Sequence, residues 1–73
     1  MHDRIVIDPK ICHGKPVIRG TRVPVVRVIG SLAGGMSPDD IQRDYDLRPE
    51  DIRAALEYAV EVLNEEQHHA LPV

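Results

Sequence analysis

The pattern of apolar and polar residues divides the chain into two short strands followed by three helices. Two β-branched runs, each followed by a chain-breaking residue, predict strands over residues 4–7 and 17–19. Apolar positions at helical spacing predict helices over residues 24–33, 38–45 and 49–67. The expected fold class is therefore mainly α, with short N-terminal β-strands followed by a three-helix core.

Proline, glycine and serine set the expected helix ends. Pro24 suits the first position of the first helix, where a missing N–H costs nothing, and Gly34-Gly35 ends that helix. Ser37 precedes Pro38 as the N-cap of the second helix. Only residues 46–48 separate the second helix from the third, and this short connection is typical of a helix-turn-helix.

The length of the chain, 73 residues, predicts one small domain. We divide it into a basic β segment (1–23), a three-helix core (24–67) and a frayed tail (68–73). Domains with a core of this size commonly gain additional stability from a disulfide, a metal or oligomerisation. Cys12 is the only cysteine, so a disulfide within the chain is excluded. We therefore expect a homodimer or a higher homo-oligomer.

The expected subunit interface combines the two strands and the apolar stripe of the third helix. An isolated hairpin is marginally stable and leaves open edges, so strand pairing between subunits would complete the sheet. The third helix carries a stripe formed by Ile52, Ala55, Leu56, Ala59, Val60 and Leu63. The candidate interface residues are Ile5, Ile7, Val17, Leu56, Val60 and Leu63.

Charge divides the chain into a basic and an acidic half. Residues 1–35 carry six Lys and Arg against two acids, a net charge of +4, whereas residues 36–73 carry three against ten, a net charge of −7. This asymmetry indicates either a polyanionic partner for the basic half or packing between oppositely charged subunits. It excludes a uniformly acidic surface.

The turn at residues 20–22 is the candidate anion site, because a glycine turn entering a helix presents backbone N–H groups. The candidate partner-binding or anion-binding residues are Lys15, Arg19, Gly20, Thr21, Arg22 and Arg27. In the alternative interpretation, Gly20 only forms a turn and the cations pair with the acidic half of a neighbouring subunit. Both interpretations stay open on the sequence.

The start of the third helix is a weak candidate for reading DNA. Such a helix would offer Arg, Lys, Asn or Gln to base edges and phosphates. Arg48 and Arg53 are the candidate DNA-reading residues, but Glu50, Asp51 and Glu57 accompany them and repel phosphate. A role in the core and the subunit interface fits this helix better.

The sequence gives no support for catalysis or for a cofactor. Cys12 and His13 are too few for a zinc site, and the Walker pattern around Gly14-Lys15 is incomplete. The longest apolar stretch is interrupted by Arg27 and too short to span a bilayer, and the N-terminus does not resemble a signal peptide. We expect a cytoplasmic protein without enzymatic activity, metal, cofactor or membrane partner.

From about Ile5 to Ala59 the chain resembles the domain-of-unknown-function family 433. The resemblance rests on Asp8-Pro9, Gly14-Lys15-Pro16, Ile18-Arg19-Gly20-Thr21-Arg22, Val23-Pro24-Val25, Gly35-Met36-Ser37, Ile52, Ala55-Leu56 and Tyr58-Ala59. It implies a homeodomain-like helical core with an N-terminal β segment, often dimeric. Arg48 departs from the pattern, since the family usually has Ser or Thr there.

The resemblance also implies a function. Family members are often predicted antitoxins, similar to VapB-type proteins and encoded beside a PIN-like ribonuclease toxin. We therefore expect a non-enzymatic antitoxin-like protein that holds a PIN-like toxin and, as a complex, is a candidate to bind operator DNA. The alternatives are a stand-alone helix-turn-helix transcriptional regulator and a structural oligomer without nucleic-acid binding.

Overall fold

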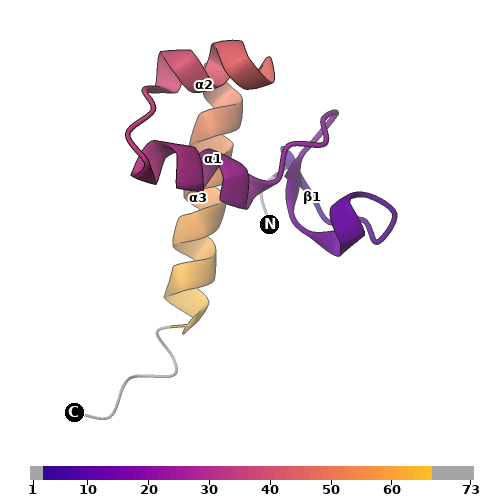
Figure 1. The fold of residues 1–73 in the computed structure, drawn as a ribbon. Helices are drawn as coiled ribbons and strands as arrows, with labels where there is room; N and C mark the ends of the chain where they lie inside the picture. The colour runs from indigo at the N-terminus through magenta and orange to yellow at the C-terminus, as the bar shows by residue number, and fades with distance from the viewer. Residues whose placement is uncertain (1–2, 67–73) are drawn as a thin grey trace, which may run out of the picture.

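The computed structural model, which describes residues 3–66, contains three helices and a short two-stranded antiparallel sheet. The elements in chain order are β1 (Ile5–Val6), the single 3-10 turn η1 (Cys12–Gly14), β2 (Val17–Ile18), α1 (Val25–Ala33), α2 (Pro38–Tyr45) and α3 (Pro49–Glu66). The long helix α3 runs along the molecule, and α1 and α2 pack across it (Figure 1). The expected mainly α fold is confirmed.

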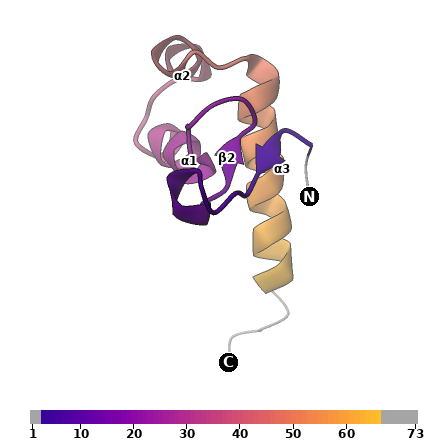
Figure 2. The same ribbon diagram turned by 90° about the vertical axis from the view of Figure 1, so that its right-hand side faces the viewer.

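The two strands pair with each other within one chain. Ile5 lies opposite Ile18 and Val6 lies opposite Val17. β1 packs against α3, and Figure 2 shows the strands beside this helix. The side chains of Ile5 and Val17 are 2% and 1% exposed, so they belong to the protein's own core.

Helix α1 begins one residue later than the proline pattern predicts. Pro24 is the N-cap residue rather than the first helical residue, because its backbone is extended (ψ 145°) and forms a bridge with Val17. The N–H of Val25 donates to the carbonyl oxygen of Pro16 at 2.9 Å. The sequence pattern did not reveal this contact, which joins the start of α1 to the N-terminal segment.

The glycine pair ends α1 as expected. Gly35 has a φ of +101°, a conformation that glycine adopts without steric cost. Its N–H donates to the carbonyl oxygen of Leu32, and the N–H of Met36 donates to that of Ser31, both at 3.0 Å. These two bonds form a Schellman motif that satisfies carbonyl groups in the last turn.

The predicted start of α2 is also confirmed. The hydroxyl oxygen of Ser37 accepts a hydrogen bond from the N–H of Asp40 at 3.1 Å, and Pro38 occupies the first helical position. At the other end, Asp46 adopts a left-handed conformation (φ 54°, ψ 47°) and caps the helix. The chain then enters α3 after Leu47, which is buried.

The first turn of α3 compensates for the poor capping residue Arg48. The backbone N–H of Arg48 donates to Oδ2 of Asp51 at 3.0 Å, which is one half of a capping box. Oδ1 of the same carboxylate accepts a hydrogen bond from Nη1 of Arg4 at 3.1 Å. Asp51 therefore caps α3 and ties the N-terminal segment to it.

The core lies where α1, α2 and the strands meet the first half of α3. Its buried apolar residues are Ile5, Val17, Ile18, Val25, Val28, Ile41, Leu47, Ile52, Ala54 and Ala55. The predicted apolar stripe of α3 continues beyond this core, but Leu56, Val60 and Leu63 are 45%, 56% and 61% exposed. The second half of α3 thus presents apolar side chains to solvent.

Candidate partner-binding surfaces

The turn between β2 and α1 is held by hydrogen bonds inside the chain. The N–H of Thr21 donates to the carbonyl oxygen of Ile18 at 3.0 Å and closes the turn. Gly20 has a φ of +80° while the space beside its Cα is open, so backbone conformation, not crowding, favours glycine here.

Thr21 has a structural role in this turn. Its hydroxyl donates to the carbonyl oxygen of Ile18 at 2.8 Å and accepts from the N–H of Val23 at 3.0 Å. The expectation of free backbone N–H groups therefore does not hold for Thr21 and Val23, whose amides are already bonded.

The arginines of the basic half differ in how much the fold uses them. Nε of Arg19 donates to the carbonyl oxygen of Asp3 at 2.7 Å, so part of its guanidinium holds the N-terminal segment. Arg22 contributes only its carbonyl oxygen, which accepts from Sγ of Cys12 at 3.4 Å. Arg22 and Arg27 are exposed, and neither takes part in an ion pair within residues 3–66.

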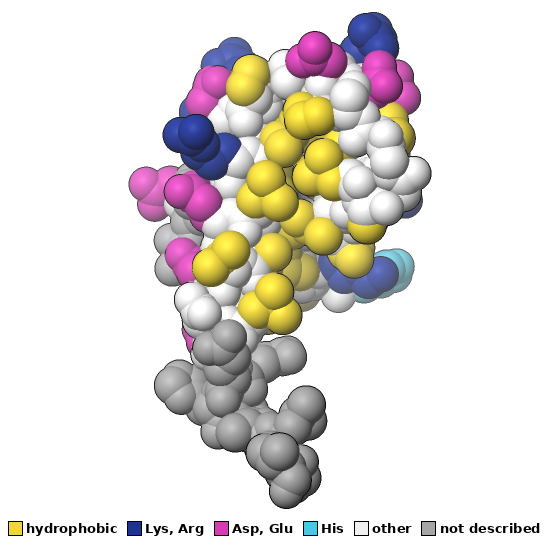
Figure 3. Space-filling model, turned by 90° about the vertical axis from the view of Figure 1, so that its left-hand side faces the viewer, with side chains coloured by type: hydrophobic (Ala, Val, Ile, Leu, Met, Phe, Trp, Pro, Cys, Tyr) yellow, Lys and Arg dark blue, Asp and Glu magenta, His cyan; other side chains and the backbone are white. Residues whose placement is uncertain are grey.

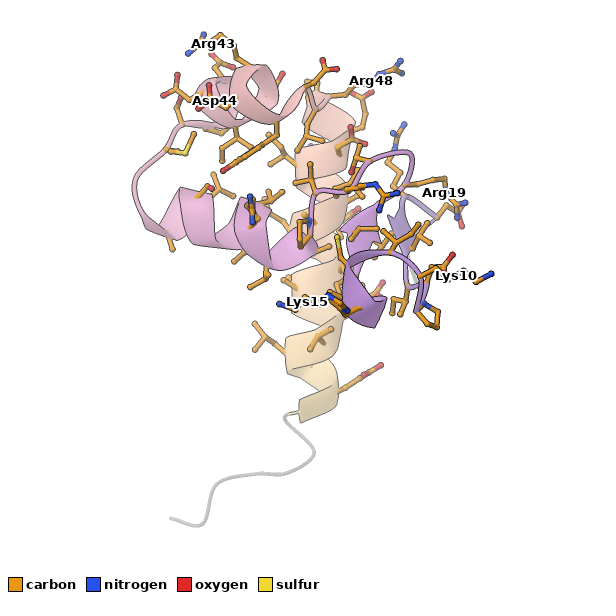
Figure 4. All side chains as sticks on the ribbon, turned by 45° about the vertical axis from the view of Figure 1, so that its right-hand side comes forward. Lys10, Lys15, Arg19, Arg43, Asp44 and Arg48 are labelled. Atoms are coloured by element: carbon orange, nitrogen blue, oxygen red, sulfur yellow. The ribbon has the colours of Figure 1, made fainter. Side chains whose placement is uncertain are left out.

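The basic side chains do not form one compact patch. Lys10 and Arg19 lie at the outer edge of the N-terminal segment, whereas Lys15 lies on the side nearer to α1 and α3 (Figure 4). Of the predicted anion-binding residues, Lys15 and Arg19 therefore lie on different sides of this segment.

An apolar groove lies between α1 and the second half of α3. It has a volume of about 530 Å³ and is lined by Lys15, Pro16, Val25, Val26, Ile29, Tyr58, Ala59, Val62 and Leu63. Figure 3 shows the hydrophobic side chains that form a continuous band on this face. Leu63 could be expected here from the apolar stripe of α3, whereas Val26, which is 65% exposed and lies one position outside the buried stripe of α1, could not.

The candidate DNA-reading arginines lie among acidic residues. Arg48 is exposed at the α2–α3 end of the molecule, the end where α2 also carries Arg43 and Asp44 (Figure 4). Arg53 lines a shallow pocket of about 310 Å³ with Pro49 and Glu50. The surface around the start of α3 therefore has mixed charge.

The candidate interface residues fall into two groups. Ile5 and Val17 are buried inside the chain and offer no surface to a second subunit. Ile7, Leu56, Val60 and Leu63 are exposed.

The described residues contain neither a cluster of metal ligands nor a helix suited to a bilayer. Within residues 3–66, no three His, Cys, Asp or Glu side chains are grouped as metal ligands would be. None of the helices in this part of the chain has the length and apolar character needed to cross a bilayer.

Two named relatives share sequence with this chain. A Mycobacterium tuberculosis protein with the name "Putative antitoxin VapB45" is 36% identical over 53 residues, which is 73% of this chain but only 22% of the relative. An "Uncharacterized protein" of Archaeoglobus fulgidus is 61% identical over 23 residues, which is 32% of this chain and 64% of the relative. The chain thus spans less than two thirds of the length of either protein.

A solved structure and a family model agree on the family. The crystal structure of a DUF433 member protein from Anabaena variabilis superimposes with a TM-score of 0.79 at 28% sequence identity, covering 93% of this chain and 68% of that one. The model of the family described as "Protein of unknown function (DUF433)" matches residues 5–59. Sequence and fold therefore agree that the chain belongs to the DUF433 family.

Proposed function

We propose that this protein is a small, non-enzymatic, antitoxin-like binding protein that holds a PIN-like ribonuclease toxin and binds operator DNA as part of that complex. The observation that carries the proposal is the 36% identity over 53 residues to a protein named as an antitoxin. The matched region is a small part of that relative, so the activity is a proposal for this chain.

The exposed arginines of the N-terminal half supply the chemistry for toxin binding. The active site of a PIN-like nuclease is a cluster of carboxylates around a divalent metal. An arginine inserted there forms charge-assisted and bidentate hydrogen bonds with carboxylates. Of Arg19 and Arg22, Arg22 suits this role better, because its side chain is exposed and takes part in no ion pair or side-chain hydrogen bond within the described residues.

Arg19 is a second candidate with a divided role. Its Nε donates to the carbonyl oxygen of Asp3, and its exposed side chain lies at the outer edge of the N-terminal segment (Figure 4). Replacing Arg19 would therefore weaken both partner binding and the attachment of the N-terminal segment. Arg22 gives the cleaner test.

Stand-alone reading of DNA by α3 receives less support. Glu50 is exposed in the first turn of α3, and Asp44 and Asp46 lie close in sequence to Arg48. Acidic side chains repel the phosphates that dominate the affinity of proteins for DNA. Operator binding is therefore assigned to the complex, where a partner supplies further contacts.

The proposal is tested by co-purification from the native host. Tagged wild-type protein should retain a PIN-like nuclease, identified by mass spectrometry, and Arg22→Ala should reduce its recovery at least several-fold. Arg43→Ala is the matched control, because Arg43 is an exposed arginine of the acidic half that pairs with Asp40. Equal recovery with both variants would contradict a role for Arg22, and recovery of no PIN-like protein by the wild type would contradict the proposed function.

A further inference from the structure

We propose that the groove between α1 and the second half of α3 is the docking site for one amphipathic helix of a partner protein, which places an acidic side chain beside Lys15. The partner is the PIN-like nuclease of the proposed function, on which this inference rests. Three features carry it: the shape of the groove, the way its walls are held, and the charge at its rim.

The groove has a buried floor between exposed apolar rims. Val25 is 6% exposed, and Tyr58 and Ala59 of α3 are half-buried. At the rims, Val26 of α1 and Leu63 of α3 are 65% and 61% exposed. A helix recognised in a groove lays its apolar face on such a floor and between such rims.

Both walls of the groove are helices with apolar residues at helical spacing. Val26 and Ile29 are three positions apart on α1, and Val62 and Leu63 follow Ala59 by three and four positions on α3. Rows of this spacing form ridges, and another helix packs its own side chains between such ridges. Because Ala59 is small, the incoming helix can approach α3 closely.

The wall on the side of the N-terminal segment is held in place by the chain itself. The N–H of Val25 donates to the carbonyl oxygen of Pro16 at 2.9 Å, and Val17 forms a bridge with Pro24. A preformed site lowers the entropic cost of binding. An extended peptide would need open backbone groups, and the carbonyl oxygen of Pro16 is already used, so a helix suits the groove better.

A single positive charge defines the chemistry of the partner helix. Within residues 3–66, Lys15 is the only charged residue that lines the groove, its side chain is exposed, and it takes part in no ion pair. A wholly apolar helix would remove water from this ammonium group without replacing its hydrogen bonds, which is unfavourable. An Asp or Glu on the partner helix supplies the complementary charge.

The groove lies near the arginine assigned to the toxin and apart from most of the candidate subunit interface. Arg22 precedes Val25 by three positions, so one partner can contact both the guanidinium of Arg22 and the groove. Leu56 and Val60 of α3 do not line the groove. A helix docked there therefore leaves these two candidate interface residues uncovered.

The first experiment measures the affinity of purified variants for the co-purified PIN-like nuclease by titration calorimetry. Val26→Glu should weaken binding at least about tenfold, because it places a carboxylate in an apolar interface. Val60→Glu is the matched control, since Val60 is 56% exposed but lies outside the groove, and it should bind like the wild type. Both variants should keep the helical circular dichroism of the wild type.

The second experiment tests the acidic side chain of the partner. Lys15→Ala should weaken binding by a factor of about two to five at low salt, and the loss should shrink as salt concentration rises. Lys10→Ala is the control, because Lys10 lies at the outer edge of the N-terminal segment (Figure 4). Equal affinities of Lys15→Ala and the wild type at low salt would overturn the assignment of an acidic partner residue.

Inhibition of the nuclease separates this inference from the proposed function. Val26→Glu should still inhibit the nuclease at saturating concentration, because its Arg22 is intact, but half-inhibition should need more protein than for the wild type. A nuclease that binds the wild type and Val26→Glu equally well would overturn the groove and leave the proposed function standing. Equal losses of affinity with Val26→Glu and Val60→Glu would also overturn it.

Two further results would contradict the inference. Sedimentation of the same variants shows whether a second copy fills the groove instead, since self-association would then be lost with Val26→Glu while the affinity for the nuclease stayed unchanged. A wild type that retains no PIN-like nuclease would overturn the proposed function and the docking of its helix together.

Discussion

Asp51 connects parts of the chain that are distant in sequence. One carboxylate oxygen accepts from the N–H of Arg48 at the start of α3, and the other accepts from Arg4 near β1. Asp51 is 8% exposed, whereas the side chain of Arg4 is 41% exposed, so the carboxylate is mostly buried and the guanidinium stays partly in contact with solvent. A single carboxylate thus replaces the missing capping side chain of Arg48 and orients the N-terminal segment.

We expect Asp51→Ala to lower the free energy of unfolding by about 1–3 kcal/mol, since it removes a helix cap and a partly buried charged hydrogen bond. Urea denaturation followed by circular dichroism measures the change. Glu50→Ala, at the exposed neighbouring position, should cost less than about 1 kcal/mol. Equal losses for the two variants would show that Asp51 acts only through its charge near the helix start.

Replacing Gly20 or Gly30 by alanine should change the stability of the protein in opposite directions. Gly20→Ala should destabilise the protein by about 1–2 kcal/mol, because the φ of +80° is unfavourable for a residue with a Cβ. Gly30→Ala should stabilise it by about 0.5–1 kcal/mol, because this glycine is exposed inside α1 and has open space around it. Thermal unfolding compares the two variants, and destabilisation by Gly30→Ala would contradict this prediction.

At the level of secondary structure elements, α3 divides into two functional parts. Its first half is fixed by the core through Ile52, Ala54 and Ala55. Its second half carries exposed apolar residues, although short isolated helices are marginally stable in water. We therefore expect this part of α3 to gain stability from contacts with another molecule.

Hydrogen exchange should reveal this division. The backbone amides of residues 52–56 should be protected at all protein concentrations, whereas protection of residues 60–64 should increase with concentration as the expected homodimer forms. Val60→Glu, which changes a candidate interface residue, provides the monomeric reference. Protection of residues 60–64 that does not depend on concentration in the wild type would contradict the contribution of the dimer.

The helix ends determined by neighbouring residues could be predicted from the sequence. Ser37 with Pro38 and the Gly34-Gly35 pair act through hydrogen bonds within a few positions, so the sequence identifies them. The extended conformation of Pro24 could not be predicted, because it depends on a bridge with Val17 in a strand.

The candidate sites were less predictable than the helices. The apolar stripe of α3 was predicted, but not how far the core would cover it, because α1 and α2 pack on its first half. The burial of Ile5 and Val17 follows from a strand pairing within the chain. The capping role of Asp51 has a local signal in the sequence, an acid three positions after the N-cap residue Arg48.

At the scale of the whole molecule, the charge division of the sequence becomes a division in space. Six of the nine Lys and Arg residues lie on the N-terminal segment and α1, whereas α2, α3 and the connection between them carry most of the acids. Long-range fields of this kind influence which partners approach and in which orientation. A partner with an acidic site is therefore directed to the N-terminal segment rather than to the α2–α3 end.

We expect the protein alone to bind DNA without sequence preference. Fluorescence anisotropy should give roughly equal affinities for operator-region and scrambled duplexes. In a plot of the logarithm of the binding constant against the logarithm of the salt concentration, the slope should be about −0.9 for each phosphate that the protein neutralises. Arg48→Ala combined with Arg53→Ala should leave the ratio of the two affinities unchanged. A marked preference for the operator that this double variant abolishes would instead support the stand-alone regulator.

The most direct test of the proposed function is inhibition of the co-purified PIN-like nuclease. The separated nuclease should cleave RNA, and added wild-type protein should inhibit it. Arg22→Glu should fail to inhibit, because it brings a negative charge to the carboxylates of the nuclease, whereas Arg43→Glu should inhibit like the wild type. Equal inhibition by Arg22→Glu and the wild type, or no inhibition by the wild type, would contradict the proposal.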